Sequence, residues 1–186
     1  MFTAYLNGDY PYDVYGGFAT QITTGIIGQT LQGELGEPLT EEKLSNAGPG
    51  PFTSRYHWNQ YDNAITDAFV ESYTDAYGIV PDLFTSGTFT AASAIVQAVE
   101  EEGSTSGADI RTGLTGMTVT DTPKGENGYT FQEYNNQARS AMTIANVVPN
   151  DEDNWDAAIR PSEPAETIPA SETTIPEDSP DMGCSL

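Results

Sequence analysis

The sequence predicts an α/β fold followed by a disordered acidic tail, and three observations support this prediction. Apolar residues recur at helical spacing over residues 62–77 and 88–102, which predicts two amphipathic helices. Short alternating segments over residues 129–134 and 140–148 are typical of strands. Residues 161–181 are rich in Pro, Ser, Thr and Glu, so we expect residues 151–186 to be largely disordered.

The first third of the chain predicts a strand, two helices and an extended segment. Residues 2–6 are apolar or aromatic and favour a short strand. Apolar residues at helical spacing predict a helix over residues 18–31. Thr40 suits the N-cap of a short helix that the Gly-Pro-Gly-Pro run of residues 48–51 ends. Residues 52–58 are then expected to be extended.

Glycines mark the ends of the two long helices. Gly78 follows Tyr77 in the C-cap position, and Gly103 follows Glu102. We expect the buried side of the second helix to carry Phe89, Ala92, Ile95, Val96 and Val99.

The chain is strongly acidic, with 28 acidic and 6 basic residues and a formal net charge of -22. Self-repulsion of this size weakens as the Debye length falls from about 30 Å at 0.01 M salt to about 3 Å at 1 M. The composition is therefore typical of a protein that works in concentrated brine, with an ordinary acidic protein as the alternative. It also argues against nucleic acid as a partner, because no basic patch is present to neutralise phosphates.

Targeting and anchoring signals are not recognisable in the sequence. Its apolar runs are shorter than the roughly 18 residues that span a bilayer, and the first residues do not resemble a signal peptide. The single cysteine, Cys184, cannot form a disulfide within the chain.

The residues that usually carry catalysis or bind metals are scarce. The one histidine, His57, lies between Tyr56 and Trp58, and a Gly-x-Ser-x-Gly motif is absent. One histidine and one remote cysteine exclude the usual zinc sites. The acidic run at residues 151–156 lacks the glycine and the distal glutamate of an EF-hand. The sequence thus predicts neither an enzyme nor a protein with a metal or cofactor.

The best candidate for a ligand site is the segment with Asp9, Tyr10, Tyr12 and Tyr15. It directly follows the predicted first strand, and ligands of α/β sheets bind outside the carboxyl ends of strands. The aspartate could pair with an ammonium group while the rings form apolar walls and cation–π contacts. The alternative is a solvent-exposed turn whose tyrosines pack on their neighbours.

Over residues 50–149 the chain resembles the second half of ABC-transporter solute-binding proteins of the branched-chain amino acid type. The resemblance is carried by Phe69 to Pro81, with its Phe, Tyr, Tyr-Gly and Pro, by Ala91 to Gly103 and by Gly116 to Val148. The acidic composition is similar to that of versions from extremely halophilic archaea.

The resemblance implies part of a type I periplasmic binding fold, with parts of two Rossmann-like lobes joined by hinge strands. Lobe two would hold residues 1–54, the hinge residues 55–60 and lobe one residues 61–115. Residues 116–150 would return to lobe two, and residues 151–186 would form the tail. The candidate hinge residues are Arg55, Tyr56, His57 and Trp58.

The resemblance also implies that half of the molecule is missing. Complete members are about twice this length, so Met1 would be a truncation or an internal start. The lobe-one helices would then have no sheet to cover and would expose an apolar patch. By the same resemblance Asp9 would bind a ligand's amino group, although the loop after it is longer than the family pattern.

The function implied is that of an extracytoplasmic, cell-surface substrate-binding component of an ABC importer. Its lobes would close by a hinge around an amino acid or a related amide, and its protein partner would be the permease in the membrane. A sensory or regulatory ligand-binding domain of the same fold is the alternative. An acidic secreted enzyme that uses carboxylates alone is a third possibility.

Overall fold

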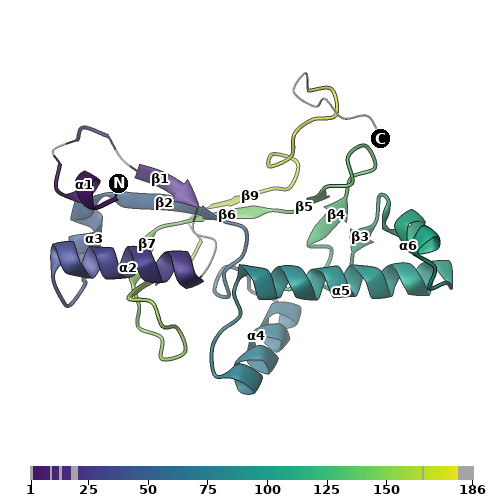
Figure 1. Cartoon of the computed structure of the whole chain (residues 1–186), viewed down its shortest axis with the longest axis horizontal. Helices are drawn as coiled ribbons and strands as arrows, with labels where there is room; N and C mark the ends of the chain where they lie inside the picture. Colours follow the sequence, from purple (N-terminus) through teal and green to yellow (C-terminus); the bar gives the residue numbers. More distant parts are fainter. Residues whose placement is uncertain (1, 9, 13, 18–20, 165, 180–186) are drawn as a thin grey trace.

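The computed structural model describes residues 2–8, 10–12, 14–17, 21–164 and 166–179, and it confirms an α/β protein. Figure 1 shows two halves along the longest axis, joined near the middle. Along the chain the elements are α1 (Phe2–Leu6), β1 (Val14–Gly17), α2 (Gln21–Leu35), α3 (Glu41–Ala47), β2 (Pro49–Ser54), α4 (Ala64–Tyr77), α5 (Leu83–Glu102), α6 (Gly107–Leu114), β3 (Thr118–Val119), β4 (Tyr129–Phe131), β5 (Ala138–Arg139), β6 (Met142–Ala145), β7 (Val147–Pro149), β8 (Ile159–Pro161) and β9 (Glu166–Ile168).

The first half, called here the sheet half, is built on a four-stranded sheet of order β1-β2-β6-β9. β1 and β2 are parallel, whereas β6 is antiparallel to both β2 and β9. Helices α2 and α3 lie beside this sheet, and β7 and β8 form a separate antiparallel pair (Figure 1). The core of the sheet half consists of the buried side chains of Leu31, Leu44, Phe52, Val147 and Ile159.

Close packing of α2 against β8 depends on a glycine. A Cβ atom at Gly28 would lie 3.3 Å from both the backbone nitrogen of Ala158 and Cγ1 of Ile159. The glycine that weakens the helix as a local element therefore lets its backbone approach the core.

The second half, called here the helix half, contains α4, α5 and α6 with the three-stranded sheet β3-β4-β5. A stripe of small side chains on α5, namely Ser86, Thr90, Ala94 and Ala98, is buried. Ala94 and Ala98 pack with Met117 and Val119, and with partly buried Ile110, Leu114, Tyr129 and Phe131. Small residues on α5 thus let α6 and β3 pack closely.

The predicted buried face of α5 is wrong for its central residues. Ile95 is 49% exposed and Val96 is 55% exposed, and Ala92 is exposed as well. The buried stripe lies about a quarter of a turn or more away, because α6 and β3 contact the side of α5 that carries alanine and threonine. The hydropathy pattern predicted burial of the most apolar face of α5, whereas α6 and β3 cover a different face.

The predicted helix ends are confirmed by their caps. Thr40 accepts a hydrogen bond from the backbone nitrogen of Lys43 at 3.2 Å. Gly78 and Gly103 adopt the left-handed conformation with φ of 73° and 62°. α5 starts five residues earlier than expected because Asp82 caps it, accepting from the backbone nitrogens of Phe84 and Thr85.

Two other local predictions differ from the structure. Residues 2–6 form helix α1 instead of a strand, so the tyrosine segment after them does not follow a strand. The extended segment 52–58 is a strand only to Ser54. Helix α6, which Ser106 caps, has no counterpart among the predicted elements.

The predicted tail is ordered in its first part. β8 pairs with β7, and β9 joins the edge of the four-stranded sheet beside β6. Trp155 and Ile159 are buried and anchor the segment before β9. β9 itself is added through backbone hydrogen bonds, which composition does not reveal. Residues 180–186, with Cys184, lie outside the described residues.

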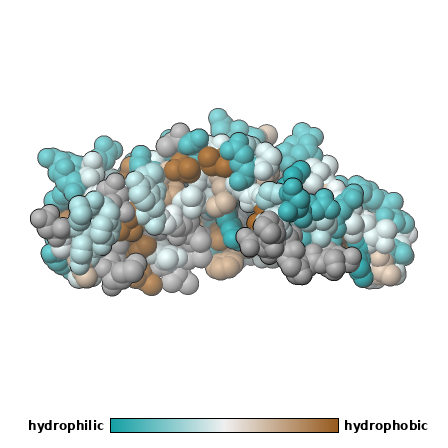
Figure 2. Space-filling view, turned by 90° about the horizontal axis from the view of Figure 1, so that it is seen from above, coloured by the Kyte–Doolittle hydropathy of each residue, from teal (hydrophilic) through white to brown (hydrophobic). Residues whose placement is uncertain are grey.

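The molecule is elongated, and its surface in the view of Figure 2 is mostly hydrophilic, with hydrophobic residues gathered near the middle of the long axis. Within the described residues, no helix has the length and apolar character needed to cross a membrane.

Candidate ligand-binding site

The two halves are joined by three linking segments, at residues 55–63, 140–141 and 169–173. The first runs from β2 to α4, and the second from β5 of the small sheet to β6 of the large sheet. The third leaves β9 and runs back toward the helix half. Its Thr173 Oγ1 donates to the carbonyl of Ser140, on the second linking segment, at 3.0 Å. Chain crossings that lie together at one junction are the usual place for a hinge, and a hinge at these segments stays a prediction.

The predicted hinge residues Arg55, Tyr56, His57 and Trp58 all lie on the first linking segment. Tyr56 is buried, stacks on Tyr61 with 6.1 Å between ring centroids and meets the edge of Phe69 at 6.3 Å. Burial raises the pKa of the Tyr56 hydroxyl well above its ordinary value, so this group stays neutral.

His57 is buried and serves as a packing residue. Its Nδ1 lies 2.8 Å from Oδ1 of Asn59, and its ring meets the edge of Trp155 at 4.9 Å. Burial lowers the pKa of His57 to about 4, against the opposing effect of the Asn59 hydrogen bond. The imidazole is therefore neutral at pH 7, and Nδ1 donates to Asn59.

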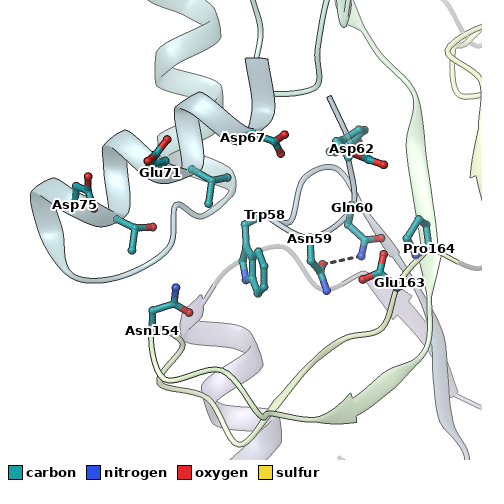
Figure 3. Close-up of a pocket in the computed structure, with 13 residues that line it drawn as sticks. Trp58, Asn59, Gln60, Asp62, Asp67, Glu71, Asp75, Asn154, Glu163 and Pro164 are labelled. Carbon is teal, nitrogen blue, oxygen red and sulfur yellow. Dashed lines mark hydrogen bonds between the residues drawn. The ribbon is translucent and has the colours of Figure 1, made fainter. Parts of the chain in front are cut away.

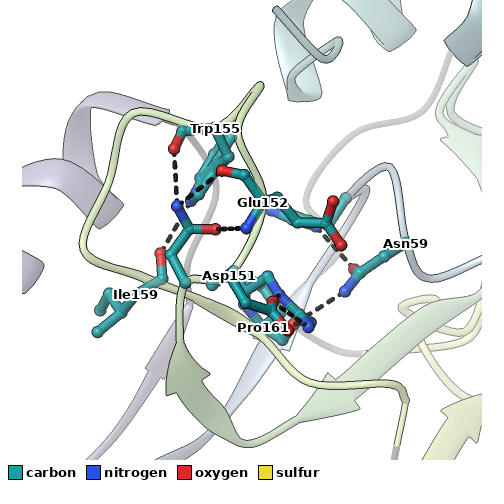
Figure 4. A network of polar contacts seen from close by, with 9 residues as sticks. Asn59, Asp151, Glu152, Trp155, Ile159 and Pro161 are labelled. Atoms are coloured by element: carbon teal, nitrogen blue, oxygen red, sulfur yellow. Dashed lines mark hydrogen bonds and ion pairs between the residues drawn. The ribbon is translucent and has the colours of Figure 1, made fainter. Parts of the chain in front are cut away.

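Amide side chains attach the first linking segment to the strand β8. Asn59 Nδ2 donates to the Pro161 carbonyl at 2.9 Å, and Gln60 Nε2 donates to the Ser162 carbonyl at 2.8 Å. Figure 4 shows the continuation of this network, in which the Trp155 indole nitrogen donates to the Ile159 carbonyl at 2.8 Å. The first linking segment is thus attached to the chain around β8 by neutral hydrogen bonds to backbone.

A small apolar cluster also lies at the junction. Trp155 and Ala157, from the loop between β7 and β8, pack against Val80, with partly buried Trp58 and Val70 beside them. The backbone nitrogen of Val80 donates to the Asn154 carbonyl at 3.3 Å. The two halves therefore contact one another next to the linking segment as well as through it.

One large hollow at the junction is acidic, and we call it the acidic hollow. Its volume is about 730 Å³, and Trp58, Asn154 and part of α4 line it. Five of its lining residues carry carboxylates: Asp62, Asp67, Glu71, Asp75 and Glu163. In Figure 3 the three acids of α4 stand along one side of the hollow, with Trp58 near its middle. Carboxylates beside an indole ring suit an organic cation.

Metal binding has no support in the arrangement of these acids. Within the part of the chain that the structure describes, no group of three or more His, Cys, Asp or Glu side chains is placed to hold a metal ion. The five carboxylates instead give the hollow a diffuse negative field.

A second hollow, of about 570 Å³, borders the same linking segment at Arg55, and we call it the basic hollow. Arg55 and Arg139 contribute its charges, and Phe84, Tyr129 and Met142 are among its apolar and aromatic lining residues. Its lining residues in the described chain include no aspartate or glutamate. Two guanidinium groups without acids beside them suit an anion.

Lys124 lies next to the basic hollow and is 8% exposed. Its Nζ donates to Ser140 Oγ and to the Ala141 carbonyl, both at 2.8 Å, and lies 4.8 Å from the ring centre of Tyr129. Burial, and to a smaller extent the nearby charge of Arg55, lower the pKa of Lys124 to about 7. Lysine is rare in this chain, with only Lys43 and Lys124, but the spacing of residues in the sequence does not relate Lys124 to Arg55.

The predicted ligand residues lie elsewhere. Asp9 falls outside the described residues, and Tyr10, Tyr12 and Tyr15 are exposed. Tyr10 and Tyr12 gather with Tyr5, with ring centroids 5.4 to 6.4 Å apart, beside a small hollow of about 340 Å³. This cluster is at the α1 end of the molecule, away from the linking segments (Figure 1). A ligand role for these residues stays a prediction.

Comparison with known proteins gives one family. The family model described as "Periplasmic binding protein" matches residues 22–153. No curated protein sequence matches the chain.

Solved structures of transport proteins share the fold. One is an ABC-type branched-chain amino acid transporter from Rhodopseudomonas palustris CGA009, at 24% identity and TM-score 0.59, covering 84% of this chain and 51% of that one. Another, from Rhodopseudomonas palustris BisB5, is a solute-binding protein in complex with 3,4-dihydroxybenzoic acid, at 14% identity and TM-score 0.66, with coverages of 91% and 49%.

A third structure is the leucine-, isoleucine-, valine-, threonine- and alanine-binding protein from Brucella ovis in its closed conformation, at 17% identity and TM-score 0.62, with coverages of 94% and 48%. The chain therefore spans about half the length of these three solved structures.

Proposed function

Because the chain belongs to the periplasmic binding protein family, whose members are solute-binding proteins, we propose that it is part of the substrate-binding component of an ABC importer. Members of the family are extracytoplasmic, bind small molecules and work with ABC permeases. For this chain, the permease in the membrane is the proposed partner and the cell surface the proposed location.

The observation that carries the proposal is the junction itself. Segments 55–63, 140–141 and 169–173 link the two halves, and both large hollows border the first of them. Small backbone rotations in such segments would swing one half against the other and close the space between them. The hydrogen bonds of the neutral Asn59 and Gln60 side chains would direct this rotation, so the charged groups at the junction would remain for the ligand.

The proposed ligand is an amino acid or a related amide. An acidic hollow and a basic hollow at one junction offer partners for an ammonium group and for a carboxylate. Several structurally similar proteins are described as amino acid binders, and one was solved with an aromatic acid. Recognition would need no covalent chemistry.

We also propose that a further part of the protein completes the helix half. In this division, residues 1–54 would belong to lobe two, 55–60 to the hinge and 61–115 to lobe one. Of residues 116–150, the strands β3, β4 and β5 pack in the helix half, and β6 and β7 would be the strands that return to lobe two. The exposed Ala92, Ile95 and Val96 face of α5 would pack on the sheet of a complete lobe one. The length of the similar structures, about twice that of this chain, supports this.

A sensory ligand-binding domain of the same fold is the second candidate, because hinge closure serves sensing as well as transport. Neighbouring genes distinguish the two. Permease and ATPase genes beside this one favour import, and a kinase or receptor gene favours sensing. The net charge of -22 supports a halophilic origin in either case.

The proposed function is tested on the protein isolated from its native source, in molar salt. Affinities for a panel of amino acids and their amides are measured by calorimetry, and closure by small-angle X-ray scattering. We expect one solute class to bind and to reduce the radius of gyration. A complete protein that neither binds nor closes on any member of the panel contradicts the proposal.

A further inference from the structure

The basic hollow gathers three of the six basic residues of the chain. Arg55 and Arg139 line it, and Lys124 lies next to it against Tyr129 and Ser140. The rest of the molecule is dominated by its 28 acidic residues, yet none of the described lining residues of this hollow is acidic. Positive charge in this chain is therefore concentrated at one place on the junction.

The two arginines are not neutralised by the protein. Across the described ranges, neither guanidinium group donates a hydrogen bond or forms an ion pair, whereas Arg160 pairs with Asp151 at 2.7 Å. An arginine in a strongly acidic chain has many carboxylates available as partners. Among the described residues, no carboxylate forms an ion pair with Arg55 or Arg139.

The residues around the two arginines suit a ligand that has an apolar part. Phe84 and Met142 supply apolar surface, and the Tyr129 ring is already in contact with the Lys124 ammonium. The hydroxyls of Ser140 and Thr173 are held by partners within the protein. The guanidinium groups, together with the side-chain amide of Gln137, are thus polar groups of the lining that a ligand can engage directly.

We propose that the basic hollow binds the carboxylate of the solute, with Arg55 and Arg139 as its ion-pair partners and Phe84 and Met142 against its apolar part. This inference rests on the proposed function and decides between its two ligand classes, because an amide has no negative charge. Guanidinium groups bind carboxylates through two parallel hydrogen bonds, which are strong and geometrically selective.

The position of the two arginines connects ligand binding to movement. Arg55 follows β2 on the first linking segment, and Arg139 ends β5 where the second linking segment begins. A carboxylate held by both would join two of the segments that cross between the halves. The closed arrangement of the hinge would then be stabilised by the ligand itself.

Benzoate and benzamide form a matched pair of probes, since they share one apolar ring and differ in charge. Their affinities for the 186-residue chain are measured by isothermal titration calorimetry in 1 M KCl, which is about the salt needed to screen the net charge. L-Leucine and L-leucinamide form a second pair, in which both members carry an ammonium group. We expect the carboxylate of each pair to bind roughly tenfold or more tightly than its amide.

Two charge-removing variants and one matched control complete the experiment. Arg55→Gln and Arg139→Gln should each weaken carboxylate binding by roughly tenfold or more. Arg111→Gln removes the same charge from exposed α6, outside the hollow, and should leave the affinity within about twofold. Circular dichroism of each variant checks that the fold is retained.

The outcomes separate this inference from the proposed function. Equal binding of carboxylate and amide, or unchanged binding by Arg139→Gln, overturns the carboxylate site and leaves a solute-binding protein. The same holds if the 186-residue chain binds no probe while the native protein binds members of the amino acid panel. If the native protein also binds no solute, both proposals fail together.

Discussion

The sheet half and the helix half treat their apolar residues differently. In the sheet half the large side chains of Leu31, Phe52 and Ile159 are buried in one cluster. In the helix half the buried stripe of α5 is made of serine, threonine and alanine, and Ile95 and Val96 are about half exposed. The helix half thus has a small buried core and an exposed apolar face on α5, on which the proposed further part of the protein would pack.

This difference is tested most strongly by removing a core side chain. Leu31→Ala deletes a fully buried group and should lower the free energy of unfolding by about 3 kcal/mol. Ile95→Ala, the matched change on α5, should lower it by less than about 0.5 kcal/mol in the 186-residue chain. Urea denaturation in 1 M KCl, followed by circular dichroism, measures both, at about the salt that screens surface charge.

Equal losses for the two variants would contradict the comparison. They would show that Ile95 is covered in solution, for example by a second copy of the chain. Repeating the measurement at two protein concentrations distinguishes that case, because self-association makes stability depend on concentration.

The junction between the halves should respond to acid through His57. The folded-state pKa of this histidine is lowered to about 4, because burial disfavours the charged form. The folded state therefore binds fewer protons than the unfolded state below pH 6.5, and stability falls as pH falls from about 6.5 to about 4. The expected loss is about 3 kcal/mol for a shift of this size.

Denaturation midpoints of the wild type and of His57→Gln, measured from pH 4 to pH 7, check this prediction. Glutamine can still donate to Asn59 but does not titrate, so the variant should lose the part of the pH dependence that belongs to His57. Parallel curves for the two proteins would show that the imidazole is solvated, and that the junction is more open than this structure has it.

The sequence was sufficient for elements whose signals are local. The caps at Thr40, Gly78 and Gly103 depend on one residue and its nearest backbone, and all three were predicted. The family was also recognisable, because the order of helix ends and strands along the chain is more specific than any single motif in it.

Features that depend on distant partners were not predictable. The buried face of α5 is chosen by α6 and β3 and not by hydropathy. β9 adds to β6 through backbone groups of an acidic, proline-rich segment. The basic hollow joins Arg55 and Arg139, which are 84 positions apart in the sequence, through the pairing of β2 with β6. The spacing of these two arginines in the sequence does not indicate that they line the same hollow.

In a complete protein, the loss of unfolding free energy caused by Ile95→Ala should be large instead of small. If a further sheet covers α5, Ile95→Ala should cost about 2 kcal/mol or more in the native-length protein, against less than about 0.5 kcal/mol in the 186-residue chain. The two proteins are compared under identical salt by urea denaturation. A negligible effect in both would contradict the proposed covering of α5, whereas Leu31→Ala should be costly in both.

The smallest expected effects reveal whether the halves fold as one unit. Thr40 caps α3 in the sheet half, and Asp82 caps α5 in the helix half, each by accepting backbone N–H groups. Thr40→Ala and Asp82→Ala should each lower the free energy of unfolding by about 1 kcal/mol. In a single cooperative transition both changes shift the same midpoint, measured by calorimetric melting.

If the exposed apolar face of α5 makes the helix half less stable, Asp82→Ala instead shifts a transition at lower temperature, while Thr40→Ala shifts one at higher temperature. A common midpoint for both variants would mean that the linking segments and the Trp155 cluster couple the halves tightly enough to offset the exposed face of α5.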